Sequence, residues 1–194
     1  MSDDDAPPPS YRHNPRPVGY PIAMRIVGDT LVVDSTRKVD EVRLGAVTRI
    51  RLTYEPRSFA QRAFRTRLTL TDGRVVGFTS VSWMSLMHVT SQEPDYSAFA
   101  RSLIAAVARA NPRVELVTGK SAAMWYAMIS GAAITLVAVA LFVWRALASG
   151  ALGAAAFGTA VGLLGIWQLE PIIRLNRPGR FPPDRPPEAL LPKG

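Results

Sequence analysis

The amino-acid sequence predicts an α+β protein in which a β-rich domain ends in one amphipathic helix and is followed by two membrane-spanning helices. Three patterns support this fold class. Apolar and polar residues alternate in the strands, apolar residues recur at steps of three and four in the helix, and two long segments near the C-terminus carry no charge. These two segments explain why 48% of the 194 residues are apolar although the formal charge is +8, a combination that one compact soluble domain seldom has.

Residues 1–20 are rich in proline and have no apolar periodicity, so they are predicted to form a disordered N-terminal arm. A β-rich domain is predicted over residues 21–119. Its hairpin turns are marked by Gly28-Asp29-Thr30 and Thr71-Asp72-Gly73.

The strands of this domain show one apolar face. In Ala46–Tyr54 and in Phe64–Thr71, aliphatic and aromatic residues alternate with arginine and threonine. Strict period two predicts antiparallel strands that are buried on one side only. After the strands, Pro94–Val107 has the spacing of one amphipathic helix, which ends before Pro112.

An antiparallel bent sheet or roll closed by a single C-terminal helix resembles the pleckstrin-homology-like (PH-like) fold, in the variety that bacteria join to membrane segments. The hairpin Leu68–Ser80 and the helix opening Pro94–Val107 carry the resemblance, which extends over about Pro21–Gly119. It implies membership of an uncharacterised, membrane-anchored bacterial family. Many bacterial relatives place the membrane spans before the domain, whereas here they follow it, so the resemblance implies a fold and no activity.

Residues 120–173 are predicted to form a transmembrane hairpin with spans over about 122–144 and 148–170. Each uncharged segment exceeds the roughly 20 residues that a helix needs to cross a bilayer. Basic residues flank the pair, and the connection between them carries only Arg145, so the positive-inside rule places both termini in the cytoplasm. The acidic N-terminus has no signal-peptide pattern. The predicted location is the bacterial inner membrane, as a multi-pass protein.

Small residues recur every four positions on each span and predict how the helices pack. We expect this packing to lie within the hairpin, with contact between one ridge and a partner as the alternative. The two ridges are Ala127, Gly131 and Thr135, and Ala154, Gly158 and Gly162. Residues 174–194 are predicted to form a Pro-rich cytoplasmic tail, which either stays disordered or docks through Leu190 and Leu191.

The candidate binding surface of the domain is basic. Arginines point away from the core on adjacent strands, and others lie in the connecting loop. Like charges across a sheet are unfavourable, so such a surface favours a partner protein or an anionic lipid, and a solvated face is the alternative. The residues are Arg49, Arg51, Arg57, Arg62, Arg65 and Arg67.

The sequence contains little that indicates catalysis or cofactor binding. The chain has no cysteine, and its histidines, His13 and His88, have no metal-ligand spacing, so no metal or cofactor is predicted. No nucleic-acid-binding motif accompanies the basic charge. The predicted function is therefore a non-catalytic integral membrane adaptor or accessory subunit that binds protein. Binding of anionic lipid is the first alternative, and a membrane enzyme of unknown type is the second.

Overall fold

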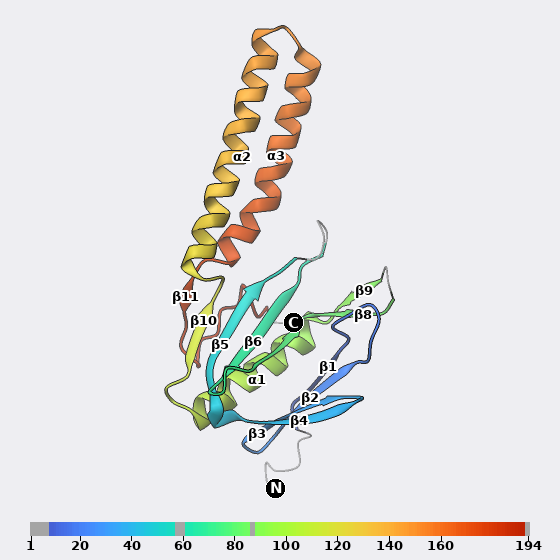
Figure 1. Cartoon of the computed structure of the whole chain (residues 1–194), viewed down its shortest axis with the longest axis vertical. Helices are drawn as coiled ribbons and strands as arrows, with labels where there is room; N and C mark the ends of the chain where they lie inside the picture. The colour runs from blue at the N-terminus through green and yellow to red at the C-terminus, as the bar shows by residue number, and fades with distance from the viewer. Residues whose placement is uncertain (1–7, 57–60, 86–87, 193–194) are drawn as a thin grey trace. The chain divides into compact units, whose positions relative to one another are not determined.

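The computed structural model (Figure 1) describes residues 8–56, 61–85 and 88–192. The chain divides into two compact units. One unit, the β-rich domain, comprises residues 1–118 together with 179–194. The other, the helical hairpin, comprises residues 119–178.

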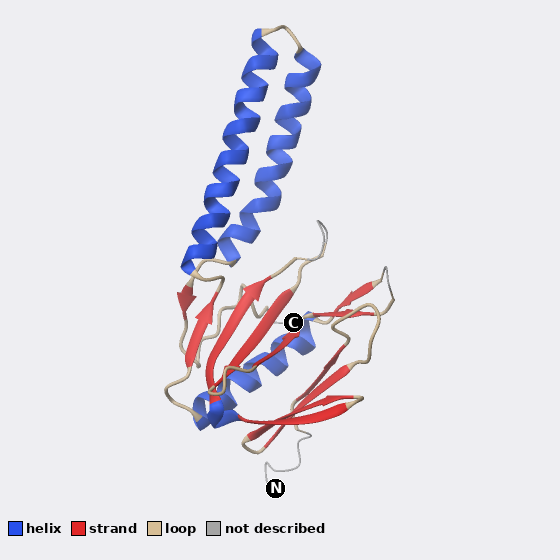
Figure 2. Ribbon diagram, in the orientation of Figure 1, coloured by secondary structure: helices blue, strands red, loops and turns tan. Residues whose placement is uncertain are grey.

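Within the described residues, the β-rich domain contains two main sheets, a short two-stranded sheet and one α-helix (Figure 2), which confirms the α+β class. The first sheet has the order β1-β2-β3-β4 and is antiparallel throughout. Its strands are β1 (Ser10–His13), β2 (Ile22–Val27), β3 (Thr30–Ser35) and β4 (Lys38–Arg43).

The second sheet has the order β11-β10-β5-β6-β7. Its pairs are antiparallel except that β10 runs parallel to β5. A 3₁₀ turn over Leu44–Ala46 connects the two sheets. The strands are β5 (Val47–Tyr54), β6 (Phe64–Leu70), β7 (Val75–Thr79), β10 (Glu115–Thr118) and β11 (Gly179–Arg180).

A short pair, β8 (Val81–Trp83) and β9 (Val89–Ser91), leads into α1 (Glu93–Ala110). Helix α1 contacts both main sheets. The Tyr96 hydroxyl lies 2.7 Å from the Thr66 hydroxyl of β6, and the Phe99 ring stacks on Tyr11 of β1 at 5.8 Å. The core therefore lies between the sheets and α1, where the alternating apolar residues of β5 and β6 are buried.

The N-terminal segment differs from its predicted disorder. Ser10–His13 form β1, which pairs with β2 in register from Ser10↔Arg25 to His13↔Ile22. Tyr11 and His13 are buried while Ser10 and Arg12 are exposed. Burial of two aromatic rings stabilises a strand that is too short for its alternation to be recognised among the surrounding prolines. Residues 1–7 lie outside the described part of the chain.

The C-terminal tail docks on the β-rich domain. Strand β11 adds to the edge of β10, and Phe181 donates a backbone hydrogen bond to Leu116 O at 3.2 Å. Leu190 and Leu191 are buried, and Arg101 of α1 donates to the Leu191 carbonyl. Docking through Leu190 and Leu191 is thus observed, and residues 179–192 belong to the domain rather than to a separate tail.

The helical hairpin consists of α2 (Ala122–Ala148) and α3 (Leu152–Leu175). By length and composition, both helices are able to cross a membrane. Gly158 and Gly162 of α3 lie against α2, where an added Cβ at Gly158 would come within 2.9 Å of Phe142 and Val143. Close approach of the helices therefore depends on the absence of a side chain at this point.

The other predicted ridge is mostly outside the hairpin interface, although Thr135 lines a hollow together with Gly158 and Val161 of α3. Ala127, Gly131 and Thr135 are exposed, and a Cβ added at Gly131 would meet nothing within 4 Å. At Ala127 and Gly131, the expectation that this ridge packs within the hairpin is wrong. Larger side chains of α2 are partly covered instead, with Val143 beside Gly158 and Val139 beside Gly162.

Candidate functional site

The outer surface of the second sheet carries a cluster of arginines that we call the arginine face, defined as Arg49, Arg51, Arg65, Arg67 and Arg180. The pleat produces this surface, because Arg65 and Arg67 alternate with buried residues along β6 and Arg51 lies between the buried Ile50 and Leu52 on β5. Ile50 and Leu68 are fully buried on the other side of the same strands. The alternation that builds the core therefore also builds the arginine face.

Register places the cluster in rows across the sheet. Arg51 lies directly opposite Arg67, and Arg67 lies opposite Gly77 of β7. On the other side, Arg51 pairs with Val117 of β10, which pairs with Arg180. This middle row contains no acidic residue.

Two glutamates lie among these arginines. Glu115 accepts from Arg49, with Nη2 2.6 Å from Oε2, and lies 3.9 Å from Arg180. The hydrogen bond from Arg49 is the main cause that lowers the pKa of the Glu115 carboxyl. Glu55, at the end of β5, contacts Arg65 and Arg67, each at 3.2 Å. Each carboxylate is thus shared by two arginines.

Arg51 lies in the most basic part of the face. Partial burial lowers the pKa of its guanidinium, the charges of Arg49 and Arg67 lower it further, and the charge of Glu115 opposes this shift. A Cβ at Gly77 would lie 3.5 Å from Cγ of Arg67 and 3.0 Å from Thr66 O, so glycine leaves room for Arg67 along the sheet.

The structure brings together four of the six predicted arginines, which are Arg49, Arg51, Arg65 and Arg67. Arg62 is exposed in the loop before β6 and lies outside the strands of the face. Arg57 lies outside the described residues. Sequence reasoning missed Arg180 and the role of Glu115, because the pairing of β10 and β11 with β5 joins segments that are far apart in the chain.

The β-rich domain also has a groove of about 1010 Å³ beside α1, which is open to solvent. Ser102, Arg109 and Asp184 are its polar lining residues, and alanines of α1 form much of its wall. A second hollow, of about 340 Å³, lies between β1 and the start of α1. The second hollow is lined by the titratable side chains of Tyr11, Arg12 and Asp95.

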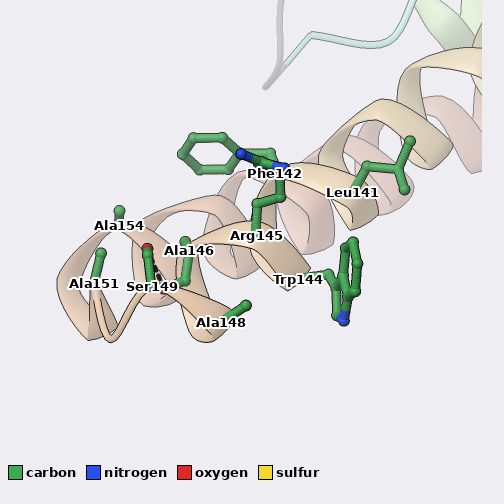
Figure 3. A pocket seen from close by; sticks show the side chains of 9 residues that line it. All are labelled: Leu141, Phe142, Trp144, Arg145, Ala146, Ala148, Ser149, Ala151 and Ala154. Carbon is green, nitrogen blue, oxygen red and sulfur yellow. Dashed lines mark hydrogen bonds between the residues drawn. The ribbon is translucent and has the colours of Figure 1, made fainter.

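At the loop end of the hairpin a hollow of about 670 Å³ surrounds the last turn of α2 (Figure 3). Arg145 is its one charged lining residue, and Figure 3 shows Arg145 and Phe142 projecting to one side of the helix and Trp144 to another. The rest of the lining is apolar apart from Ser149. One guanidinium among apolar residues has the composition of a membrane-interface turn rather than of a reaction centre.

Among the described residues, no group of three or more histidine, aspartate or glutamate side chains is placed to hold a metal ion. His13 is buried in the core and His88 lies in the connection between β8 and β9, so the two histidines have separate surroundings.

The fold and the arginine face define an α+β domain joined to an apolar helical hairpin. Comparison with protein-family models, curated proteins and solved structures finds no match to this chain. Its function has therefore to be inferred from its own residues.

Proposed function

We propose that this protein is a non-catalytic, membrane-anchored adaptor or accessory subunit. The α2–α3 hairpin spans the bacterial inner membrane, and the β-rich domain, a PH-like module, binds another protein at the cytoplasmic face. The arrangement of two sheets and a helix that follows them supports the PH-like assignment. The docked tail supports placing both ends of the hairpin on one side, because the chain enters and leaves it through paired strands, β10 and β11.

The observation that carries the proposal is the exposed apolar surface of the hairpin. Large apolar side chains are exposed on both helices, with Ile134 70% and Phe157 69% exposed. Buried core helices would cover such residues. In the most apolar 18-residue stretch of each helix, however, the share of buried residues is 0% in α2 and 11% in α3. Water disfavours a continuous apolar surface of this size, and lipid chains solvate it.

Membrane insertion and orientation can be tested with cysteine labelling, because the chain has no cysteine of its own. Ser149→Cys lies in the hairpin loop and Thr36→Cys lies in an exposed turn of the domain. A membrane-impermeant maleimide added to spheroplasts should label Ser149→Cys and should label Thr36→Cys only after lysis. Recovery of the chain in the soluble fraction, or the reverse labelling, would contradict the proposal.

The adaptor role predicts a stoichiometric protein partner. Crosslinking in native membranes followed by purification in mild detergent should yield one defined complex, identified by mass spectrometry. A tagged two-helix membrane protein of unrelated sequence serves as the control for non-specific association. Repeated recovery of the chain by itself would count against the adaptor role and would leave the anchor unaffected.

A further inference from the structure

Arg145, at the loop end of the hairpin, has no carboxylate of the hairpin beside it. Glu170 is the only acidic residue of α2 and α3, and it pairs with Arg174 near the end of α3, with Nε 2.5 Å from Oε1. A guanidinium that lies close to the hydrocarbon of a membrane is stabilised by an anionic partner. An anion that pairs with Arg145 therefore comes from outside α2 and α3.

The surroundings of Arg145 continue along the hairpin as a groove. Arg145 lines the hollow of about 670 Å³ at the loop end (Figure 3), and a second hollow of about 300 Å³ lies farther along the two helices. Phe142 lines both hollows, and its ring packs against Gly158 of α3. Residues of α2 at steps of three and four share this side of the helix, namely Thr135, Ala138, Phe142 and Arg145. The two hollows thus form one groove, which we call the hairpin groove.

The hairpin groove is charged at one end and apolar at the other. In the second hollow, Thr135 is the polar lining residue, and its hydroxyl donates to a backbone carbonyl of α2 at 2.9 Å. At the loop, the Ser149 hydroxyl donates to a carbonyl of the last turn of α2 at 3.0 Å, and the backbone N–H groups of residues 149–151 also donate to carbonyls of α2. The positively charged donor of the groove is therefore Arg145.

A phospholipid has the same order of groups, with a phosphate at one end and acyl chains beyond it. The planar guanidinium forms paired hydrogen bonds with phosphate oxygens. From Phe142 to Thr135 the groove follows seven residues of α2, about 10 Å of helix, along which an acyl chain can lie.

The lining of the groove also distinguishes between headgroups. A zwitterionic headgroup carries an ammonium group, which is stabilised by a carboxylate or by the face of an aromatic ring. No carboxylate lines the groove, and Trp144 projects to a different side of α2 from Arg145 (Figure 3). An anionic headgroup, which has no ammonium group, therefore matches this site better.

We propose that the hairpin groove binds one anionic phospholipid, with its phosphate on Arg145 and an acyl chain that passes Phe142 toward Thr135. The proposal rests on the proposed membrane anchor, for which it names a ligand. The source of the phosphate is a membrane lipid, because a free phosphate ion would leave the apolar part of the groove without a ligand.

Native mass spectrometry of the full-length chain in a non-ionic detergent tests the proposal. Phosphatidylglycerol and phosphatidylethanolamine with identical acyl chains are the two probes, and the unmodified chain should bind the first several-fold more tightly. The double variant Arg145→Leu, Leu147→Arg keeps the composition but moves the guanidinium out of the groove, since the exposed Leu147 does not line it. This variant should lose about tenfold in affinity for phosphatidylglycerol, as expected when hydrogen bonds to one charged group are lost.

Three single variants serve as checks, each with an unfolding temperature to show that the hairpin is intact. Arg145→Gln should show the same loss as the double variant without adding an arginine elsewhere. Arg174→Gln removes an arginine from the other end of the hairpin and should leave the affinity unchanged. Ala138→Leu narrows only the apolar hollow, so it should weaken binding of both lipids and leave the preference for phosphatidylglycerol.

Three results would overturn the proposal. Equal affinities for the two lipids would show that the headgroup is not recognised. Unchanged affinity in the double variant would show that any arginine near the loop attracts the lipid, whether or not it lies in the groove. Release of phosphatidylglycerol by inorganic phosphate at constant ionic strength would identify a site for free phosphate.

These outcomes are separable from failure of the membrane anchor. If labelling of Ser149→Cys shows the proposed insertion but the chain has no lipid preference, the groove is excluded as a lipid site and the anchor remains. If the chain is recovered in the soluble fraction but retains phosphatidylglycerol with the expected selectivity, the lipid site is supported and the anchor is excluded.

Discussion

Gly119 packs directly against the backbone of Asn176, with no space for a side chain between them. Gly119 has φ +70°, and an added Cβ would overlap the carbonyl oxygens of Asn176 and Arg177. The next residue, Lys120, donates its backbone N–H to Asn176 O at 3.0 Å, and Trp125 Nε1 donates to Ile173 O at 2.9 Å. This contact closes the open end of the hairpin, where the chain enters α2 and leaves α3.

Gly119→Ala is therefore expected to destabilise the hairpin by more than the usual cost of a left-handed residue, which is about 1–2 kcal/mol. Gly150→Ala is the matched control, because Gly150 also has positive φ but has no neighbour near its Cβ position. Thermal unfolding in a non-ionic detergent should show a larger loss for Gly119→Ala. Equal losses would mean that the overlap with Asn176 is relieved without cost.

Packing within the hairpin predicts that a larger side chain is tolerated at Gly131 but not at Gly158. Gly158→Val places methyl groups where Phe142 and Val143 already lie, so we expect a loss of about 1–3 kcal/mol. Gly131→Val adds the same atoms on a helix face with nothing within 4 Å and should be close to neutral. Unfolding temperatures in detergent compare the two variants directly. A greater loss from Gly131→Val would indicate that the exposed ridge has a partner in the folded protein.

The sequence was most informative where the pattern is local. Alternation in Phe64–Thr71 predicted both the buried side of β6 and its arginines, because the pleat alone decides which side chains share a face. Pro94–Val107 likewise lies within α1, and the uncharged segments lie within α2 and α3. In each case, the residue pattern that predicts the structure lies within a single helix or strand.

Long-range pairing was not predictable. Strand β10 runs parallel to β5, and β11 joins the same sheet from beyond the hairpin, so Glu115 and Arg180 reach the arginine face from distant segments. Neither strand is long enough for alternation to show. The small-residue ridges illustrate the same limit, since Gly131 and Gly158 have similar surroundings in sequence and only the mutual rotation of α2 and α3 decides which one is covered.

Docking of the C-terminal segment predicts that the stability of the domain depends on Leu191. Leu191 is fully buried, so Leu191→Ala should cost about 2–5 kcal/mol through lost burial and the cavity that remains. Val39→Ala, at an exposed position of β4, should change stability by less than about 0.5 kcal/mol. Limited trypsin digestion should also cleave after Arg180 faster in Leu191→Ala. Unchanged stability and unchanged cleavage would show that the segment is not held by this side chain.

The buried ring of His13 is expected to make the stability of the domain depend on pH. His13 is 1% exposed and stacks on Tyr11 at 5.5 Å, and neither of its ring nitrogens has a hydrogen-bond partner within the described residues. Burial lowers the pKa of His13 from 6.5 to about 4. The folded domain thus holds this imidazole neutral under conditions in which the unfolded chain binds a proton.

Because the unfolded chain binds more protons between these two pKa values, the stability contributed by His13 is complete above pH 6.5 and declines as the pH falls toward 4. The full loss amounts to roughly 3 kcal/mol. His13→Phe keeps an aromatic ring beside Tyr11 and removes the titration, so its unfolding free energy should be flatter than that of the unmodified chain across this interval. Urea unfolding at several pH values measures the difference, with His88→Phe as the control for an imidazole outside the core. Parallel profiles for the unmodified chain and His13→Phe would show that His13 gains a proton without opening the fold.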